Sequence, residues 1–418
     1  MAVNKITIDE FLLLAKTNPV LDVRSPGEYA HAHIPNAVSL PLFNDDERAK
    51  VGTTYKQQSR EDAIKIGLDF FGPNMRGMVE KVEGIIGSWQ RAVGKRQGAV
   101  DKGQFAKGNE FLEKVSNVED SNYPLQTANC VLLHCWRGGM RSAAVAWLLD
   151  LYGFKVYTLI GGYKTYRNWV LEQFTKEYNF NIIGGYTGSG KTLLLHALAK
   201  ENNHIIDLEG LANHKGSALG ALGNEPQPKQ EMFENLLAKE LDDRQQTTDN
   251  RQYQLYNESS KLKEPALNLH PSTFNSIWLE DESQRIGNLQ IPMPLWYTMR
   301  KAPVYFVDIP FEERLNYLTD EYGIHPKADL VNAIMRIQKR LGGLETKNAI
   351  NFLLENNFKE SFRILLHYYD KYYLKGLKNR DDAENLIKNI PAETVDTEKN
   401  IRLINPMLTV SNIQTNII

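Results

Sequence analysis

One stretch constrains the fold more than any other: "NFNIIGGYTGSGKT" at residues 179–192. An apolar run comes before its glycines, and the helix-forming run "LLLHALAK" follows. The stretch contains G-x-x-x-x-G-K-T, which begins at Gly185 and ends at Gly190, Lys191 and Thr192. A strand, a tight loop and a helix in this order place backbone N–H groups around a phosphate chain, and the helix N-terminus adds positive potential. The sequence therefore predicts a phosphate-binding P-loop in an α/β unit.

Seven residues of this loop are predicted to bind a diphosphate: Gly185, Thr187, Gly188, Ser189, Gly190, Lys191 and Thr192. The lysine of such a loop reaches the terminal phosphate oxygens, and the hydroxyl residue binds Mg²⁺. A carboxylate at the end of another strand usually completes the magnesium site. We therefore predict Thr192 and Asp281 as metal ligands, with Asp207 and Glu209 of "IIDLEG" as the alternative. The motif does not distinguish ATP or GTP from another diphosphate, such as an allylic diphosphate.

A second loop lies in "VLLHCWRGGMRSAAV" at residues 131–145. Cys135 ends an apolar run and is predicted to be a catalytic nucleophile. The N-terminus of the following helix and two arginines should favour its thiolate. The glycine pair lets the loop amides turn inward and form an anion-binding nest. The predicted anion-binding loop comprises Trp136, Arg137, Gly138, Gly139, Met140 and Arg141.

The spacing around Cys135 is compatible with two kinds of chemistry. His134-Cys135, five residues and then Arg141-Ser142 fit a cysteine-dependent phosphatase. A cysteine that opens a glycine-rich loop after a strand also fits a rhodanese, which carries sulfur or selenium. The one other cysteine is Cys130. Five residues of strand span about 16 Å, too far for a disulfide, so Cys130 is expected to be a buried strand residue.

Apolar runs along the chain predict two successive α/β units. Strands are expected within 19–25, 33–42, 129–135 and 155–163 of the first unit, with a helix over 141–154. In the second unit they are expected within 179–185, 204–209, 276–282 and 304–309, and the chain is helical beyond about 325. Such alternation favours parallel sheets covered by helices. We predict domains over 1–175 and 176–325, followed by a mainly helical region over 326–418.

Residues 45–120 interrupt the first unit as an insertion. They are polar and partly helix-forming, and "RAVGKRQGAVDKGQFAKGNE" at 91–110 is expected to be a loop. Its arginines and lysines lie close together in sequence, so the segment is either a solvated loop or a surface that faces nucleic acid. "RIQKR" at 336–340 is the second candidate for a basic patch.

Overall charge and hydropathy exclude two classes of protein. The formal net charge is −2, which rules out a chain that is basic all over, although a local basic face remains compatible with it. No apolar run approaches the roughly 18 residues of a membrane span, and the first residues do not resemble a signal peptide. We expect a cytoplasmic protein without a membrane partner. The sequence leaves its oligomeric state open.

The first unit resembles a rhodanese domain. "DVRSPGEYAHAHIPNAVSLPL" (22–42) is similar to the N-terminal rhodanese motif, and "VYTLIGGY" (156–163) to the last rhodanese strand and its turn. Ala32 and Asn36 replace the usual glycines, and the cysteine loop has one residue more before its arginine than a sulfur-transferring rhodanese usually has. That longer loop is what keeps the phosphatase alternative open.

A rhodanese-like domain followed directly by a P-loop domain resembles the bacterial tRNA 2-selenouridine synthases, across nearly the whole chain. The resemblance includes "NDDERAKVGTTYKQQ" (44–58), "CWRGGMRS", "IGGYTGSGKT", "DLEGLANHKGSALG" (207–220) and "WLEDESQRIG" (278–287). It implies a transferase that replaces the sulfur of 2-thiouridine at the wobble position of tRNAs for Lys, Glu and Gln. Selenophosphate would supply the selenium, and S-geranyl-2-thiouridine made from geranyl diphosphate would be the intermediate.

The same resemblance implies which loop serves which step. The P-loop would hold geranyl diphosphate, and the Cys135 loop would hold selenophosphate or carry selenium on its thiol. Trp136, Tyr163 and Tyr186 are candidates to stack on the flipped base, and a place in the core is the alternative for each. A cysteine phosphatase and a sulfurtransferase are the alternative functions. The sequence does not state whether the host cell makes selenophosphate.

Overall fold

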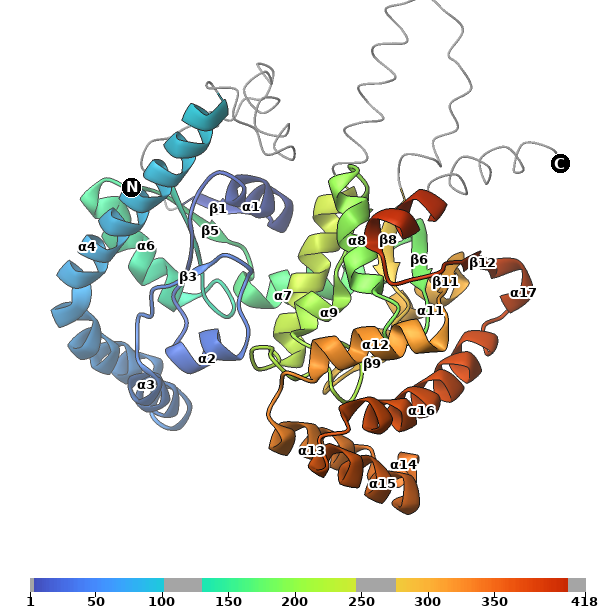
Figure 1. Ribbon diagram of the computed structural model, residues 1–418. Helices are drawn as coiled ribbons and strands as arrows, with labels where there is room; N and C mark the ends of the chain where they lie inside the picture. Colours follow the sequence, from blue (N-terminus) through green and yellow to red (C-terminus); the bar gives the residue numbers. More distant parts are fainter. Residues whose placement is uncertain (1–3, 101–129, 246–275, 405–418) are drawn as a thin grey trace, which may run out of the picture. The chain divides into compact units, whose positions relative to one another are not determined.

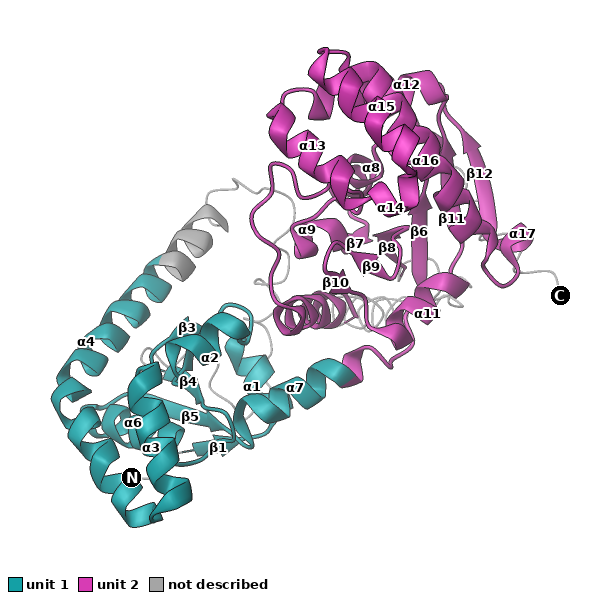
Figure 2. Ribbon diagram, turned by 90° about the horizontal axis from the view of Figure 1, so that it is seen from below, with its two compact units in different colours: residues 1–171 teal, residues 172–418 magenta. Residues whose placement is uncertain are grey.

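The computed structural model describes residues 4–100, 130–245 and 276–404, with the backbone alone over 92–100. The chain divides into two compact units, Met1–Leu171 and Glu172–Ile418, which are coloured separately in Figure 2. Each unit is described by itself. The predicted domain boundaries at 175/176 and 325/326 stay a prediction.

The first unit alternates short strands with helices, and Figure 1 labels most of them. In chain order they are β1 (Asn4–Ile6), α1 (Ile8–Ala15), β2 (Val20–Asp22), α2 (Pro26–His31), β3 (Val38–Ser39), α3 (Asp45–Gln57), α4 (Arg60–Val100), β4 (Cys130–His134), α6 (Met140–Tyr152), β5 (Lys155–Leu159) and α7 (Gly162–Gln173).

The sheet of this unit has the order β1-β5-β4-β2-β3, and all of its pairs are parallel. Central strand β4 is buried along its whole length, as its unbroken apolar sequence predicts. Val131, Leu133 and Cys135 pack on one face with residues of α4 and α6. His134 points to the other face, where its ring meets Phe11 of α1. Cys135 therefore follows the carboxyl end of a fully buried strand.

The insertion differs from its prediction in one respect. The expected loop over 91–110 is wrong for its first ten residues, because α4 continues to Val100. Arg91, Ala92 and Gln97 are strong helix formers, and they outweigh the cost of about 1 kcal/mol that each glycine imposes on a helix. Residues 101–110 lie outside the described residues. Earlier in α4, Phe71, Val82 and Ile86 are buried in the core of the unit, so this part of the insertion is integral to the fold.

The second unit contains the remaining elements. They are β6 (Phe180–Gly184), α8 (Lys191–Lys200), β7 (His204–Ile205), α9 (Leu208–Ala212), β8 (Ile277–Glu280), β9 (Arg285–Ile286), β10 (Leu289–Gln290), α11 (Met293–Lys301), β11 (Val304–Asp308), α12 (Phe311–Tyr322), α13 (Lys327–Arg336), α14 (Gln338–Leu341), α15 (Gly343–Leu354), α16 (Phe358–Lys378), α17 (Ala383–Leu386) and β12 (Ile387–Pro391).

The main sheet of this unit has the order β12-β11-β6-β8-β7, again with parallel pairs. Strand β12 lies in the region that was expected to be mainly helical, and it pairs with β11 along five residues. Its sequence "IKNIP" lacks the length and apolar density that reveal a buried strand. Helices α12, α13, α15 and α16 form a separate apolar cluster that includes Leu315, Leu330 and Leu366. The α/β fold class, with a rhodanese-like sheet followed by a P-loop sheet and a largely helical C-terminal region, is confirmed.

Candidate active site

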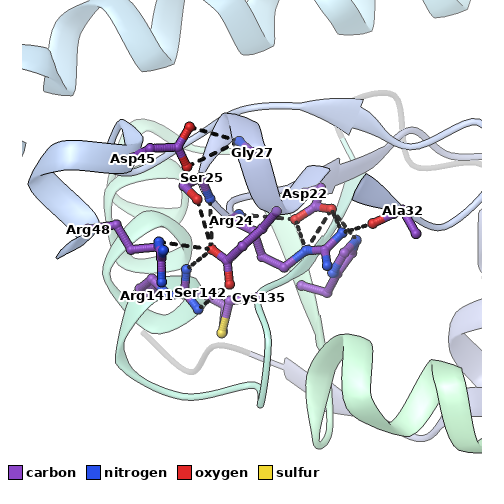
Figure 3. A network of polar contacts seen from close by, with 12 residues as sticks. Asp22, Arg24, Ser25, Gly27, Ala32, Asp45, Arg48, Cys135, Arg141 and Ser142 are labelled. Carbon is purple, nitrogen blue, oxygen red and sulfur yellow. Dashed lines mark hydrogen bonds and ion pairs between the residues drawn. The ribbon is translucent and has the colours of Figure 1, made fainter. Parts of the chain in front are cut away.

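Cys135 lies one residue beyond β4 and is only 3% exposed. Its Sγ is 3.3 Å from Oγ of Ser142, in the first turn of α6 (Figure 3). The Ser142 hydroxyl also lies 3.1 Å from the carbonyl oxygen of Gly139, to which it can donate. A hydroxyl has a single proton. Ser142 can therefore accept from a thiol while it bonds Gly139, or turn and donate to a thiolate.

The turn after β5 supports the backbone of the cysteine loop. The amides of Tyr163 and Lys164 donate to the carbonyl oxygens of Cys135 and Trp136, at 2.8 and 3.0 Å. Gly138 and Gly162 have positive φ angles of 64° and 61°. A Cβ on Gly138 would lie 2.7 Å from the carbonyl oxygen of Leu159, and one on Gly162 would overlap the carbonyl oxygen of Cys135. Glycines at both places thus allow the two turns to pack directly together.

Arg141 is held by a carboxylate from a distant part of the sequence. Its Nη1 donates to Oε2 of Glu28 at 2.7 Å, and Nε of Arg48 lies 4.0 Å from the same oxygen. Glu28 also caps α2 by accepting from the Ser25 amide at 3.1 Å. Burial opposes its charge, but Arg141 and the Ser25 bonds hold the pKa of Glu28 below its usual range. Glu28 is thus an ionised carboxylate that fixes the guanidinium of Arg141.

A buried charged group lies beside the cysteine loop. Nη2 of Arg24 pairs with Oδ2 of Asp22 at 2.6 Å, and both side chains are inaccessible to solvent (Figure 3). The Arg24 guanidinium lies 3.8 Å from the ring centroid of Tyr163. Nη2 also donates to the Ala32 carbonyl oxygen at 2.7 Å. This pair ties the rhodanese-like motif near residue 22 to the turn that carries the cysteine loop.

His134 is fully buried directly before Cys135. Burial lowers the pKa of His134 to about 4, and the nearby Asp22 carboxylate only partly offsets this effect. Neither ring nitrogen has a hydrogen-bond partner among the described residues. The imidazole is consequently neutral at physiological pH and packs between the rings of Phe11 and Tyr163.

The rest of the predicted anion-binding loop faces outward. Trp136 and Met140 are 37% and 47% exposed, and Arg137 and Gly139 are exposed as well. The Trp136 ring lies 5.7 Å from that of Tyr163, between ring centroids. Loop side chains are therefore accessible to a substrate above the buried thiol, and Arg137 is a cation free to turn toward it.

The P-loop connects β6 with α8. Gly188 and Gly190 adopt positive φ angles of 81° and 71°. A Cβ on Gly188 would come within 3.0 Å of the Arg314 carbonyl oxygen, so α12 packs directly against the loop. Nζ of Lys191 donates to the Gly185 carbonyl oxygen at 3.1 Å. Oγ of Ser189, a residue only 1% exposed, has no hydrogen-bond partner among the described residues. Buried hydroxyls usually have a partner, and a bound phosphate would supply one.

Carboxylates gather around the end of this loop. Oγ1 of Thr192 donates to Oε2 of Glu209 at 2.7 Å. Glu282 lies beside Glu209, and a Cβ on Gly216 would lie 2.6 Å from Oε2 of Glu282. Burial raises the pKa of Glu209, and Lys191 opposes the shift. Burial together with Glu209 raises the pKa of Glu282 well above its usual range. Lys191 thus compensates the charge of these crowded carboxylates only in part.

These oxygens suit a magnesium ion. Mg²⁺ prefers carboxylate and hydroxyl oxygens and is commonly held by one or two carboxylates together with substrate phosphates. Among the described residues no three His, Cys, Asp or Glu side chains are placed to hold a metal by themselves. Thr192 and Glu209 therefore fit an ion that a diphosphate would help to bind.

Asp281 lies in a different environment from Thr192. It forms an ion pair with Arg380 and accepts from the Tyr373 hydroxyl at 2.7 Å. The same hydroxyl accepts from the Gly185 amide at 3.0 Å. Burial raises the pKa of Tyr373 well above its usual range, which keeps its proton available for Asp281. Asp281 thus links the P-loop to α16, and its direct binding of magnesium stays a prediction that these bonds disfavour.

Helix α16 is connected to the P-loop at a second point through Arg314 of α12. Asp370, one turn before Tyr373, accepts from Nη2 of Arg314 at 2.8 Å. Nη1 of Arg314 donates to the Thr187 carbonyl oxygen at 3.1 Å. The Arg314 guanidinium also lies 4.6 Å from the ring centroid of Tyr186. Two residues of one helix therefore fix the shape of the loop.

A basic surface continues from α14 along α16. The side chain of Arg340, in the predicted "RIQKR" patch, hydrogen-bonds Tyr368. The Tyr368 ring lies 4.7 Å from that of Tyr372, which is 47% exposed. Lys371 and Lys375 are exposed on the same helix and form no ion pair within the described residues. Cations interleaved with an accessible aromatic ring suit a nucleic acid. Of the other predicted patch, 91–107, the part beyond Val100 lies outside the described residues.

Sequence reasoning missed several of these residues. Tyr373, Arg314 and Arg380 act through contacts between elements that are 56 to 188 residues apart, which no local pattern reveals. Glu282 stands beside Asp281 in "WLEDES", but the sequence does not show which carboxylate faces the loop. The role of Glu28 could have been found, because a glutamate at the third position of a helix signals a capping box.

Known proteins resemble both units. A sequence profile described as the tRNA 2-selenouridine synthase AAA domain matches residues 178–267 and 254–397, and a rhodanese-like domain profile matches 7–66. The tRNA 2-selenouridine synthase of Sulfurovum sp. (strain NBC37-1) is 30% identical over 86% of this chain and 89% of its own length. That of Bdellovibrio bacteriovorus is 30% identical over 91% and 94%, and that of Hydrogenovibrio crunogenus is 31% identical over 86% and 90%.

The chain belongs to the tRNA 2-selenouridine synthase family. The relatives have nearly the same length as the matched region, so the family assignment covers both units. Members bear the name of a tRNA-modifying transferase, which confirms the expected class of enzyme. No described helix is long and apolar enough to cross a membrane.

Proposed function

We propose that this protein replaces the sulfur of wobble-position 2-thiouridine, in tRNAs for Lys, Glu and Gln, with selenium from selenophosphate. The reaction passes through S-geranyl-2-thiouridine made from geranyl diphosphate. One observation supports the proposal: a chain of this family has a buried thiol at the start of a loop with two arginines, and a glycine-rich loop that ends in a lysine and a threonine. Substrates of this kind occur in the cytoplasm, which is where we expect the protein.

The P-loop is the proposed site of geranyl transfer. The 2-thio sulfur attacks the allylic carbon of geranyl diphosphate, the C–O bond breaks, and the diphosphate leaves with the electron pair. Loop amides, Lys191 and the unpartnered Ser189 hydroxyl stabilise the charge that develops on the leaving oxygens. Geranylation matters because it turns the sulfur into a thioether, which can leave in the next step.

For magnesium we propose Thr192 together with Glu209 in place of Asp281. Thr192 already contacts Glu209, whereas Asp281 is engaged by Arg380 and Tyr373. Magnesium would neutralise diphosphate charge at this position. Thr192 and Glu209 bring a hydroxyl and a carboxylate together, and Tyr373 of α16 holds the P-loop backbone in its conformation.

The cysteine loop is the proposed site of selenium delivery. Trp136 to Arg141 surround the donor, and Arg141 is oriented by Glu28. Selenium then attacks C2 of the geranylated base, the C–S bond breaks, and geranyl thiolate leaves. The basic surface of Arg340, Lys371, Tyr372 and Lys375 is the proposed contact for the tRNA.

Nucleoside mass spectrometry tests the function. A tRNA that carries 2-thiouridine is incubated with the protein, first with geranyl diphosphate and then also with selenophosphate. S-geranyl-2-thiouridine should form first and 2-selenouridine second. Cys135→Ser should lose selenation and retain geranylation, whereas Lys191→Ala should lose both. Unchanged tRNA under every condition contradicts the function, and normal selenation by Cys135→Ser contradicts the role of the thiol.

A further inference from the structure

We propose that Cys135 attacks the phosphorus of selenophosphate, so that the S–P bond forms, the P–Se bond breaks and selenide leaves with the electron pair. Cys135 then holds a phosphoryl group as S-phosphocysteine and does not carry selenium. This inference rests on the proposed function, from which it takes the donor, and it states which atom of the donor the thiolate attacks.

The length of the loop is the first support. Five residues separate Cys135 from Arg141, as in cysteine-dependent phosphatases, and a sulfur-transferring rhodanese usually has one fewer. The loop begins at a strand end and runs into the N-terminus of α6, where free amides favour an anion. A longer loop gives amides and arginines room around a whole tetrahedral phosphoryl group. A shorter one suits contact with only the outermost atom of a donor.

The absence of an acid in the loop is the second support. A phosphate ester needs a proton donor, because an alkoxide leaves poorly. Residues 136–141 contain no carboxylic acid. Glu28 is the carboxylate that contacts Arg141, and its pKa lies below the usual range, so it carries no proton to give at neutral pH. Selenium leaves together with the donor's own proton as hydrogen selenide, which is a weak base, so it needs no acid from the loop. The loop is therefore suited to a P–Se bond and unsuited to an ordinary phosphate ester.

Electron balance is the third support. Attack at phosphorus changes no oxidation state, and it delivers selenide, the nucleophile that C2 of the base requires. Selenium carried as a perselenide on Cys135 would be oxidised relative to selenide, and its release would need a reductant such as a second thiol. The chain has one other cysteine, Cys130, which is buried at the opposite end of β4. No thiol of this chain is placed to supply those electrons.

Ser142 assists the second step, the hydrolysis of S-phosphocysteine. Water attacks the phosphorus of S-phosphocysteine, the S–P bond breaks, and inorganic phosphate leaves. The sulfur departs as a thiolate, and the Ser142 hydroxyl 3.3 Å away can turn from Gly139 and donate to it. A hydrogen bond to the charged form of a leaving group stabilises the transition state of this step. Loss of the hydroxyl should slow hydrolysis more than the first attack.

The experiment follows phosphorus and selenium separately. The full chain is mixed with selenophosphate that is radioactive at phosphorus, quenched within one turnover, and digested. We expect radioactive phosphorus on the peptide that holds Cys135, without selenium. Ser142→Ala should accumulate at least several times more of this label than the wild type. Cys135→Ser should show none. Cys130→Ala, the matched control at the start of β4, should label as the wild type does.

Two results would overturn the inference: selenium on Cys135 without phosphorus, or neither element on Cys135 in both the wild type and Ser142→Ala. The tRNA assay separates these outcomes from a failure of the proposed function. If 2-selenouridine forms while Cys135 carries selenium, the function stands and the phosphoryl intermediate falls. If phosphorus labels Cys135 but tRNA stays unchanged under every condition, the function falls.

Discussion

The buried imidazole of His134 makes the stability of the first unit depend on pH in a defined window. Burial lowers its pKa to about 4, from about 6.5 in an exposed histidine. Between these values the unfolded chain binds more protons at this site than the folded protein does. Stability therefore rises with pH through this window, and it is lost as pH falls from 6.5 toward 4.

The magnitude follows from the two pKa values. A lowering of this size corresponds to at most roughly 3 kcal/mol, and between pH 7 and pH 4.5 the linkage relation gives about 2 kcal/mol. With a urea m-value of about 2 kcal/mol/M, the unfolding midpoint should fall by about 1 M. Asp22 makes a separate contribution to stability, which is lost over a lower pH range. Its pKa is lowered by His134 and Arg24 against the effect of burial, so its contribution disappears only below its ordinary value of 3.8.

Cys130 reports the unfolding of this unit alone, because both cysteines lie in it and Cys130 is 4% exposed. Its labelling by a thiol reagent that works in acid is measured by peptide mass spectrometry against urea concentration, at pH 7 and pH 4.5. His134→Phe should fit between Phe11 and Tyr163 and should reduce the pH-dependent shift by about 1 M. His31→Gln removes an exposed imidazole of the same unit and should not. An unchanged shift in His134→Phe would refute the reasoning.

Three further predictions concern function. Glu209→Gln should raise the Mg²⁺ concentration for half-maximal geranylation roughly tenfold, about 1.4 kcal/mol. Asp281→Asn should leave that concentration unchanged and lower the melting temperature, because the buried Arg380 loses its carboxylate partner. Equal effects of the two variants on the Mg²⁺ concentration would contradict the assignment. Gly162→Ala should abolish selenation but keep geranylation, because its Cβ would overlap the Cys135 carbonyl oxygen. Gly139→Ala should be tolerated in both assays, because a Cβ at this position would meet no atom within 4 Å. Lys371→Gln with Lys375→Gln should weaken tRNA binding, measured by filter retention, and lower the salt slope by roughly 1.4 to 1.8. Lys359→Gln should change neither, because Lys359 of α16 already lies close to Glu312 of α12.

The two loops were predictable because each is a local pattern. A run of apolar residues, glycines at fixed offsets and a following helix determine the path of the backbone over some ten residues, and the structure has β4–α6 and β6–α8 in those places. The predicted strand residue Cys130 is buried, as expected. The sequence alone therefore predicts those parts of the structure that depend on neighbouring residues.

Contacts between distant elements were not predictable. The sequence "WLEDES" offers three carboxylates, and only the position of α16 decides that Asp281 meets Tyr373 while Glu282 turns toward Glu209. Strand β12 was missed for a related reason, because a polar edge strand has little pattern of its own and forms through pairing with β11. Basic residues and glycines predicted a loop over 91–110, but arginine and lysine favour helices, and the first ten of these residues continue α4.

The cysteine loop and the P-loop differ in the charge of the residues around them. The cysteine loop contains arginines and no acid, so it attracts an anion without help, and the neighbouring carboxylates of Glu28 and Asp22 are already bound to Arg141 and Arg24. The P-loop has Lys191 beside Glu209 and Glu282, and burial raises the pKa of both carboxyl groups although Lys191 opposes the shift. A diphosphate that enters there brings more negative charge to the same place, which costs energy at short range unless a cation enters with it. Geranyl transfer should therefore require a divalent cation, whereas cleavage of selenophosphate at Cys135 should not.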